Sequence, residues 1–256
     1  MLNPESEWFG FRHVKPQDKT GLVRGVFDSV AEHYDLMNDL MSGGLHRVWK
    51  DRLVAMMSPQ AGQTLLDVAG GTGDIALRCY RRTEGKADIT VCDINPHMLK
   101  RGRARMIDEG ILPQGQGTSR PIHFITGNAE ELPIPSRSVD LYSIAFGLRN
   151  VSRIDNALRE AARVLRPGGR FFCMEFSPGV SPLLKPVYER YCMSVLPWLG
   201  EHVAHDAEAY QYLAESILKF PPQAALAERM KKAGLDNVRW TNLTGGVAVI
   251  HSGWKL

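Results

Sequence analysis

The feature that most constrains the fold of this chain is a glycine-rich loop between two apolar runs. The first run, residues 64–69, is short and continuous, as in a buried strand of a parallel sheet. Three glycines follow, which let the backbone turn sharply and approach a ligand: Gly70, Gly71 and Gly73. A helix over residues 75–82 then leads to a second strand over residues 88–93. Asp93 ends that strand where nucleotide-binding folds place an acid on the ribose hydroxyls, so the pattern predicts a nucleoside-cofactor enzyme.

Two cofactors fit this pattern. Residues 71–76 satisfy the GxGxxG/A spacing of NAD-binding enzymes. Asp74, however, follows the last glycine at the mouth of the helix, where a carboxylate would repel a pyrophosphate. S-adenosylmethionine has no phosphate and carries positive charge, so Asp67 and Asp74 favour it over NAD. The alternative is that both acids only cap the loop or the helix.

Bulk properties indicate one globular enzyme domain spanning residues 1–256. The chain is 44% hydrophobic and 23% charged, which are ordinary globular values, and it is long enough to bury a full core. Its net charge of +3 is too small to indicate nucleic-acid binding. Its four cysteines lack CxxC spacing, so we expect reduced, buried thiols and no metal site. We find no apolar run of membrane-spanning length and no signal or transit peptide pattern.

The rest of the sequence continues the alternation of helices and strands. Helices are expected over residues 96–109, 155–165 (capped by Asp155) and 222–233, and strands over 123–126, 139–145 and 170–176. A helical insert at about 182–218 interrupts the pattern, and a hairpin over 238–242 and 247–251 ends it. A mostly parallel sheet closed by such a hairpin is typical of the methyltransferase variant of the doubly wound fold. We therefore predict a class I S-adenosylmethionine-dependent methyltransferase with a Rossmann-like, doubly wound sheet and a C-terminal antiparallel hairpin.

Further motifs cover nearly the whole chain. The most specific are Tyr-Asp-Leu-Met-Asn-Asp-Leu-Met-Ser at 34–42 and Phe-Gly-Leu-Arg-Asn-Val at 146–151. Others lie at residues 9–11, 26–31, 44–50, 67–74, 93–95, 128–133, 166–170 and 212–217. With these motifs the chain resembles the C-methyltransferases of ubiquinone and menaquinone biosynthesis. The resemblance implies C-methylation of a polyprenylated benzoquinol ring, 2-methoxy-6-polyprenyl-1,4-benzoquinol, with demethylmenaquinol as the alternative substrate.

Two other classes of protein remain open at this point. An NAD-dependent reductase would explain only the glycine loop and Asp93. A non-catalytic scaffold of the same fold would have lost the cofactor loop, which is intact in this chain.

The resemblance also implies a location and partners. Residues 144–146 and the ending at 251–256 are more similar to the mitochondrial ubiquinone enzymes than to the bacterial ones. A polyprenyl tail lies in lipid, so we expect a peripheral protein on the matrix side of the mitochondrial inner membrane. A bacterial cytoplasmic protein is the alternative. A homodimer and membership of a multienzyme complex of ubiquinone biosynthesis are further possibilities that the sequence leaves open.

The matching family positions assign the cofactor contacts. They are Asp67, Gly71, Thr72, Gly73, Asp93, Asn128 and Ala129. Thr72 would offer its backbone amide and hydroxyl to the methionine moiety, and the carboxylate of Asp93 suits both ribose hydroxyls. Asn128 and Ala129 would hold the adenine ring. The alternative for Asn128 is an ordinary turn asparagine.

Three residues are candidates for catalysis. The ring becomes far more nucleophilic as a phenolate, so a hydroxyl proton has to leave. Arg149 cannot readily act as a base, because a guanidinium pKa exceeds about 12; we expect it to stabilise the phenolate while water or His46 takes the proton. Asn150 would orient the ring. The alternatives are that Arg149 braces the loop by pairing with an acid and that His46 is structural.

Two segments are expected to cover the site: an N-terminal helical segment at about 20–58 and the helical insert. Tyr34, Met37 and Met41 suit a prenyl tail, and residues 186–199 are similarly apolar. Core packing and a dimer interface are the alternatives, and the sequence does not separate these three roles.

Overall fold

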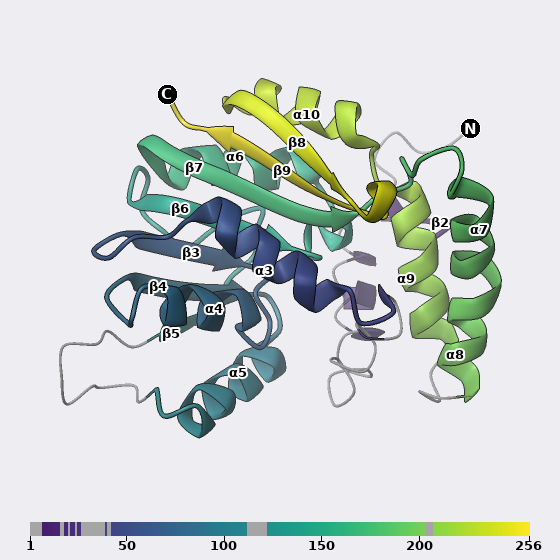
Figure 1. The fold of residues 1–256 in the computed structure, drawn as a ribbon, viewed down its shortest axis with the longest axis horizontal. Coiled ribbons are helices and arrows are strands. Elements are labelled where there is room, and N and C mark those ends of the chain that lie inside the picture. The colour runs from purple at the N-terminus through teal and green to yellow at the C-terminus, as the bar shows by residue number, and fades with distance from the viewer. Residues whose placement is uncertain are drawn as a thin grey trace.

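A computed structural model of the chain describes residues 7–15, 18–19, 21–23, 25–26, 39, 42–111, 122–202 and 207–256. A seven-stranded sheet crosses the molecule between layers of helices (Figure 1). In spatial order the strands are β5 (Ile122–Thr126), β4 (Asp88–Asp93), β3 (Thr64–Val68), β6 (Val139–Ala145), β7 (Leu165–Phe176), β9 (Ala248–Trp254) and β8 (Asp236–Leu243). The first five strands are parallel to one another, and β9 runs antiparallel to both β7 and β8. The predicted fold class is confirmed.

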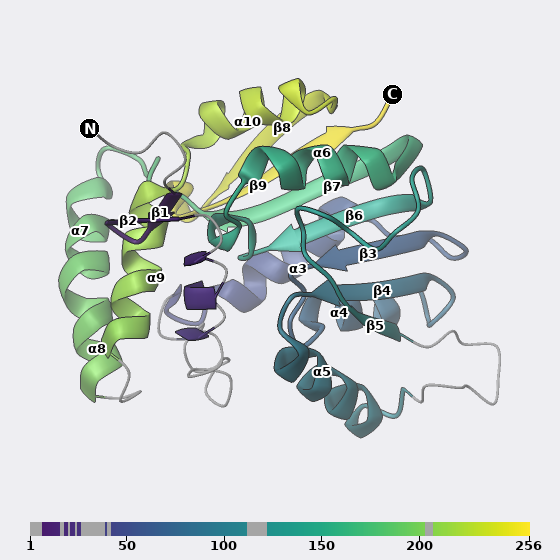
Figure 2. The same ribbon diagram turned by 180° about the vertical axis from the view of Figure 1, so that it is seen from behind.

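Helices cover both faces of the sheet. On one face lie α3 (His46–Met57) and α4 (Asp74–Arg82), with α5 (Pro96–Asp108) beside β4 and β5. On the other lie α6 (Ile154–Val164) and α10 (Gln223–Lys232), as Figure 2 shows from behind. A strand covered on both faces has no wet side, which explains the continuous apolar runs in the sequence.

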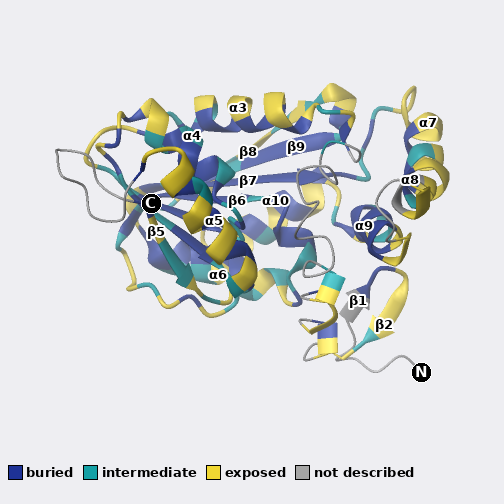
Figure 3. Cartoon of the chain, turned by 90° about the horizontal axis from the view of Figure 1, so that it is seen from below, coloured by how far each residue is buried: buried dark blue, intermediate teal, exposed yellow. Residues whose placement is uncertain are grey.

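Alternate residues of the central strands enter two separate cores. Leu65 and Leu141 pack on the side of α3 and α4, while Leu66 and Tyr142 pack on the side of α6 and α10. All four are almost completely buried. The view from below shows the buried sheet between exposed outer helix faces (Figure 3). The carboxyl edge of the parallel strands is thereby held rigidly in place.

The helical insert stands beside the carboxyl edge of the sheet. It consists of α7 (Lys185–Arg190), a π-helical turn (Tyr191–Val195), α8 (Leu196–His202) and α9 (Ala207–Lys219). α9 contacts the short 3-10 turn Leu148–Asn150 that follows β6. An N-terminal hairpin of β1 (Glu7–Phe9) and β2 (Arg12–Val14), which the sequence did not predict, packs on α9 through a stack of Phe9 on Tyr212 with ring centroids 4.2 Å apart.

Several local predictions need correction. Asp155 does not cap α6: the helix begins after Arg153, and the Asp155 carboxylate accepts a hydrogen bond from Arg229 Nε at 2.6 Å. The strand predicted over 170–176 begins earlier, as β7, because Leu165 already pairs with Val139 of β6; residues 166–169 form an irregularity inside the strand before Arg170 pairs with Leu141.

The predicted N-terminal cover is only partly described. Its α3 portion is a core helix and not a cover, because Leu53 and Met57 are fully buried against the sheet. The proposed prenyl-lining residues Tyr34, Met37 and Met41 lie outside the described residues. All four cysteines are free and buried, as predicted.

Candidate functional site

An open cavity, with about 800 Å³ of empty space including the solvent at its mouth, lies at the carboxyl ends of the central strands. Five predicted site residues line it: Gly71, Asp93, Asn128, Ala129 and Asn150. Asp67 and Thr72 line a smaller cavity next to it, and Arg149 lines a third. Gly73 and His46 line none of these three. The structure thus brings together most, but not all, of the predicted cofactor site.

The backbone is unusual where β3 and β6 end at this cavity. Ala69 and Phe146 have φ of 50° and 57°, in the left-handed region that non-glycine residues rarely adopt. The next residue after Phe146 is Gly147, and a Cβ there would lie 2.4 Å from the Cβ of Ala69. The two strand ends therefore touch, and a side chain at Gly147 would force them apart.

Asp93 is held rigidly at the cavity wall. Its Oδ2 accepts a hydrogen bond from the Gly71 amide at 2.9 Å, and its Oδ1 accepts one from the Asn95 amide at 2.8 Å. Burial raises the pKa of Asp93, against the effect of these backbone donors. Each carboxylate oxygen has a second lone pair, so the fixed carboxylate can still accept two neighbouring hydroxyls. This geometry fits the ribose of a nucleoside cofactor.

Asn128 shows the turn role that was its alternative. Its Oδ1 accepts the Glu130 amide at 3.0 Å, so the side chain stabilises the turn while the segment lines the cavity. Glu130, which sequence reasoning missed, accepts the amides of Ser152 and Arg153 at 3.1 Å each. It ties the two loops at this side of the cavity together. Ala129 lies between Asn128 and Glu130 and also lines the cavity.

Arg149 makes the bracing contact that was the alternative to catalysis. Its Nη1 lies 2.8 Å from Glu175 Oε2 and donates to the Phe146 carbonyl at 2.6 Å. Both charged side chains are 2% exposed. Burial raises the pKa of Glu175, although the Arg149 guanidinium opposes this. Glu175, on the buried strand β7, was not predicted from the sequence, and the catalytic role of Arg149 stays a prediction.

Asn150 lies between two cavities. It lines the main cavity, and its Oδ1 accepts a hydrogen bond from the Tyr212 hydroxyl at 3.0 Å. Tyr212 in turn lines the third cavity beside Arg149. The bond from Tyr212 orients the Asn150 amide, which leaves its N–H groups available as donors.

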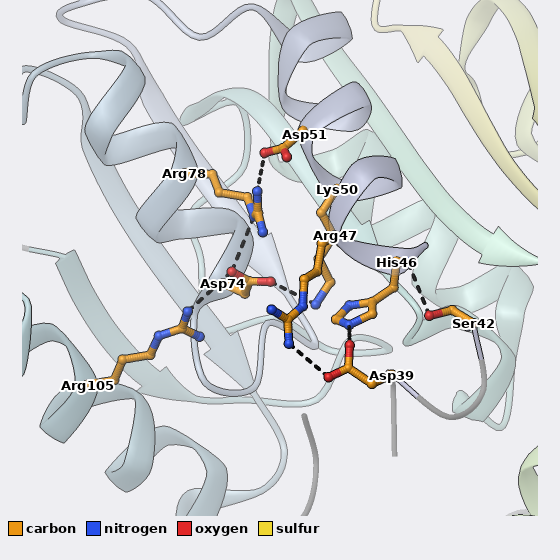
Figure 4. Close-up of polar contacts among 9 residues, drawn as sticks. All are labelled: Asp39, Ser42, His46, Arg47, Lys50, Asp51, Asp74, Arg78 and Arg105. Atoms are coloured by element: carbon orange, nitrogen blue, oxygen red, sulfur yellow. Dashed lines mark hydrogen bonds and ion pairs between the residues drawn. The ribbon is translucent and has the colours of Figure 1, made fainter. Parts of the chain in front are cut away.

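His46 is in a structural setting. Its Nε2 lies 2.9 Å from Asp39 Oδ1, and its side chain is 4% exposed (Figure 4). Burial lowers the pKa of His46 and outweighs the hydrogen bond to Asp39. Because it lines none of the three cavities, its geometry gives no support to the predicted role as base.

Asp74 does not present a free negative charge to a ligand. Lys50 Nζ lies 2.8 Å from Asp74 Oδ2, and Arg78 and Arg105 lie 3.3 and 3.4 Å from Oδ1 (Figure 4). Burial opposes ionisation, but these three cations lower the pKa of Asp74 to about 2. This geometry gives no support to the expectation that Asp74 attracts a cationic cofactor. Gly73, just before it, allows close packing, since a Cβ there would lie 3.2 Å from Met106 and Phe124.

Asp67 lies near the end of β3, and its side chain is buried. Its Oδ1 accepts a hydrogen bond from Ser143 Oγ at 2.7 Å, while Oδ2 has no partner among the residues that the structure describes. Burial raises the pKa of Asp67 to about 7, against the effect of the Ser143 bond. Near neutral pH the protein therefore holds this carboxyl close to the midpoint of its titration.

The raised pKa of Asp67 predicts how stability depends on pH. The folded pKa of about 7 lies above the unfolded value of 3.8, so the contribution of this group is full below the unfolded pKa and is lost as pH rises toward 7. Asp67→Asn should remove this dependence. Between pH 5 and 6 the unfolding free energy of the variant, relative to wild type, should rise by about 1.4 kcal/mol. Urea unfolding at both pH values, without cofactor, checks this; a constant difference would contradict it.

Comparison with known proteins identifies the family. The sequence model of the ubiE/COQ5 methyltransferase family matches residues 13–255. The chain is 51% identical over 253 residues to the ubiquinone/menaquinone biosynthesis C-methyltransferase UbiE of Paracoccus denitrificans, covering 99% of this chain and 98% of that protein. It is 50% identical over 250 residues to UbiE of Brucella abortus, covering 97% and 90%. This chain belongs to the ubiE/COQ5 methyltransferase family.

Solved structures support the same fold at low sequence identity. A SAM-dependent methyltransferase of Thermotoga maritima has a TM-score of 0.63 at 17% identity and covers 91% of this chain and 100% of its own. A phosphoethanolamine N-methyltransferase of Haemonchus contortus, solved with S-adenosyl-L-methionine, has a TM-score of 0.58 at 13% identity and covers 81% and 52%. These likenesses show the class I methyltransferase fold.

Family membership settles the choice between cofactors. This ubiE/COQ5 family member is an S-adenosylmethionine-dependent methyltransferase, as predicted, and not an NAD-dependent reductase. The compared UbiE relatives are bacterial. In the described part of the chain no helix is long and apolar enough to cross a membrane.

Proposed function

We propose that this chain methylates a ring carbon of a polyprenylated benzoquinol, 2-methoxy-6-polyprenyl-1,4-benzoquinol, in ubiquinone biosynthesis. The observation that carries the proposal is the rigid Asp93 carboxylate, which faces a large cavity beside the loop 146–151. The match to ubiquinone/menaquinone C-methyltransferases along the whole chain supports the ring substrate. Because the name of those relatives covers both quinones, demethylmenaquinol is the second candidate.

The proposed reaction forms a bond between a ring carbon and a methyl group. Bound S-adenosylmethionine supplies the electrophilic methyl, and the electrons of the broken bond stay on sulfur. The chain has to hold the ring in line and dry, and Phe146 and Val151 provide apolar walls for this. Asn150, with its amide oriented by Tyr212, would donate to a ring hydroxyl.

The hydroxyl proton needs an acceptor, and we propose that it is water. Glu175 balances the charge of Arg149, so Arg149 would act mainly by holding the loop 146–151 in place. Its Nε, which has no partner in the described part of the chain, would be the donor left for a phenolate. The ring C–H proton is then lost to solvent as the ring regains aromaticity.

A turnover assay tests the function. Purified protein with S-adenosylmethionine should methylate a demethylated benzoquinol. A demethylated naphthoquinol is offered in a parallel reaction under the same conditions. We expect the benzoquinol to have the higher kcat/KM, with the new methyl on carbon by mass spectrometry and NMR. Faster naphthoquinol turnover would select the second candidate, and methylation of oxygen or of neither ring would overturn the proposal.

We also propose that the helical insert contacts a lipid surface. Six apolar side chains are exposed on it, from 38% to 86%: Leu183, Leu184, Val187, Met193, Val195 and Trp198. Exposed Lys185 and Arg190 flank them and suit anionic headgroups. A substrate with a polyprenyl tail has to be taken from lipid, and apolar groups gathered on one surface segment are typical of such contacts.

The lipid contact predicts a loss of vesicle binding. The triple variant Leu183→Gln, Val187→Gln and Trp198→Gln should reduce co-flotation with phosphatidylcholine–phosphatidylglycerol vesicles about tenfold, because burial of large apolar side chains in lipid is lost. A matched control replaces exposed apolar residues elsewhere, Val48 and Trp240, with glutamine. Equal flotation of the triple variant and wild type would contradict the contact. A change from dimer to monomer in the triple variant would assign this face to a second copy instead.

The bacterial relatives favour the cytoplasmic face of a bacterial membrane as the place of action. The mitochondrial inner membrane and a multienzyme complex stay predictions.

A further inference from the structure

The loop 146–151 forms a wall between two cavities. Val151 lines both the main cavity and the third cavity, and Asn150 lines the main one. Two backbone hydrogen bonds, of 3.1 and 3.2 Å, close the short 3-10 turn that contains Asn150. Such turns have poorer hydrogen-bond geometry than α-helices. Neither bond fixes the Asn150 side chain, so its position depends on the groups that contact the turn from behind.

Lys19 contacts the end of this loop from the N-terminal segment. Its Nζ donates to the Val151 carbonyl at 3.0 Å, although 132 residues separate the two in the sequence. Lys19 is only 5% exposed, which is unusual, because an ammonium is costly to remove from water without hydrogen-bond acceptors. The side chain lines the third cavity together with Arg149. The charged donor of Lys19 thus holds the backbone directly after Asn150.

Tyr212 contacts the Asn150 side chain itself from α9. Its hydroxyl donates to Asn150 Oδ1 at 3.0 Å, and its ring is stacked on Phe9 of the N-terminal hairpin at an interplanar angle of 18°. The hairpin is attached to α9 a second time, where the Phe11 amide donates to Glu215 Oε2 at 2.8 Å. Phe9 and Tyr212 are each 4% exposed. A buried and stacked ring has few alternative rotamers, so the direction of the Tyr212 hydroxyl is fixed.

Both contacts involve the N-terminal segment, here its described residues between 7 and 26. These pieces lie between α9 and the carboxyl edge of the sheet (Figure 2). Val23, in the same segment, is 7% exposed and lines the main cavity. The segment therefore reaches the Val151 backbone directly, the Asn150 side chain through Tyr212, and the main cavity itself.

We propose that Lys19 and Tyr212 are positioning residues for methyl transfer, which together with the N-terminal hairpin hold the Asn150 amide toward the ring. The inference rests on the proposed role of Asn150 as a donor to a ring hydroxyl. Lys19 and Tyr212 line the third cavity and not the main one, so they act through the loop and do not touch the ring. A misplaced donor lets the ring turn out of line with the methyl group, which slows the chemical step.

Tyr212→Phe tests the contact to Asn150, because it removes the hydroxyl and keeps the ring that stacks on Phe9. With the benzoquinol, kcat should fall about 5- to 20-fold and KM should change less. The calorimetric affinity for S-adenosylhomocysteine should stay within about twofold. The matched control is Tyr210→Phe, on the same helix, 1% exposed and lining none of the three cavities, which should change none of these values. Wild-type kcat in Tyr212→Phe would overturn its positioning role.

Lys19→Met tests the contact to the Val151 carbonyl. It removes the ammonium and should also lower kcat about 5- to 20-fold. Lys15→Met, at an exposed lysine of the same segment, is the control and should have no effect. Lys19→Arg keeps a charged donor and should recover most of the lost rate. A folded Lys19→Arg protein that is as slow as Lys19→Met would count against the bond to the carbonyl.

Double variants show whether these residues act through Asn150. In an Asn150→Ala background, Tyr212→Phe and Lys19→Met should each lower kcat by no more than about twofold further, because the group that they position is gone. Phe9→Leu, which removes the stack, should lower kcat in the wild type and add little to Tyr212→Phe. Thermal unfolding establishes that each variant is folded.

Two failures are distinguishable in these experiments. Full and independent losses of kcat in the double variants would show that Lys19 and Tyr212 only support the fold, and would overturn the positioning role. A wild-type protein that methylates neither ring would instead overturn the proposed function on which the inference rests.

Discussion

Arg149→Ala is expected to lower the free energy of unfolding by about 3–5 kcal/mol, because it leaves a buried carboxylate without its cation. Glu175 is 2% exposed, and its ion pair with Arg149 at 2.8 Å is lost in this variant. Burial already raises the pKa of Glu175, and removal of the guanidinium should raise it further. The destabilisation should therefore be smaller at pH 5 than at pH 8. Denaturant unfolding at both pH values measures it.

A double variant separates stability from catalysis at Arg149. Arg149→Met combined with Glu175→Gln removes both charges and should recover most of the lost stability. If Arg149 also stabilises the phenolate, this folded protein should bind S-adenosylmethionine normally but turn over more slowly, since charge stabilisation in the transition state lowers kcat. Turnover at the wild-type rate would show that Arg149 is only a brace. Water would then have to accept the hydroxyl proton without help from Arg149.

Asp93→Asn is expected to weaken the binding of S-adenosylhomocysteine by about 1.5–3 kcal/mol, or roughly 10- to 150-fold. The substitution replaces a carboxylate that can accept both ribose hydroxyls by an amide with one acceptor. It also places an N–H₂ group opposite the Gly71 or Asn95 amide, where the carboxylate now accepts. Asp88→Asn, at the other end of β4, removes the same charge and should have no effect on binding. Calorimetric affinity within twofold of wild type in Asp93→Asn would remove Asp93 from the site.

The local pattern of apolar runs and glycines in the sequence was sufficient to predict the fold. Parallel strands covered on both faces leave continuous apolar runs, and Gly71 and Gly73, with φ of 55° and 77°, mark the turn that joins β3 to α4. The same logic placed Asp93 and Asn128 at the cavity, because the carboxyl ends of parallel strands meet at one edge. The predicted boundaries of helices and strands were less accurate. In β7, for example, pairing with the neighbouring strand rather than composition decided where the strand starts.

Function at the level of family also followed from the sequence alone. Motifs at 34–42 and 146–151 resemble those of quinone C-methyltransferases, and the family model confirmed that resemblance. The acidic loop favoured S-adenosylmethionine over NAD, although one of its two acids, Asp74, turned out to be neutralised by Lys50, Arg78 and Arg105.

The pairing of buried charges was decided only by the tertiary structure. Arg149, on the 3-10 turn after β6, meets Glu175 on β7, 26 residues away, and Lys50 reaches Asp74 from a different helix. Periodicity in a sequence tells which face of an element a side chain occupies, but not which distant side chain it meets there. The protonation of Asp67 likewise depends on burial beneath a loop. The sequence by itself therefore determined the fold, the family and the strand-end residues, whereas packing determined which charged groups remain available to a ligand.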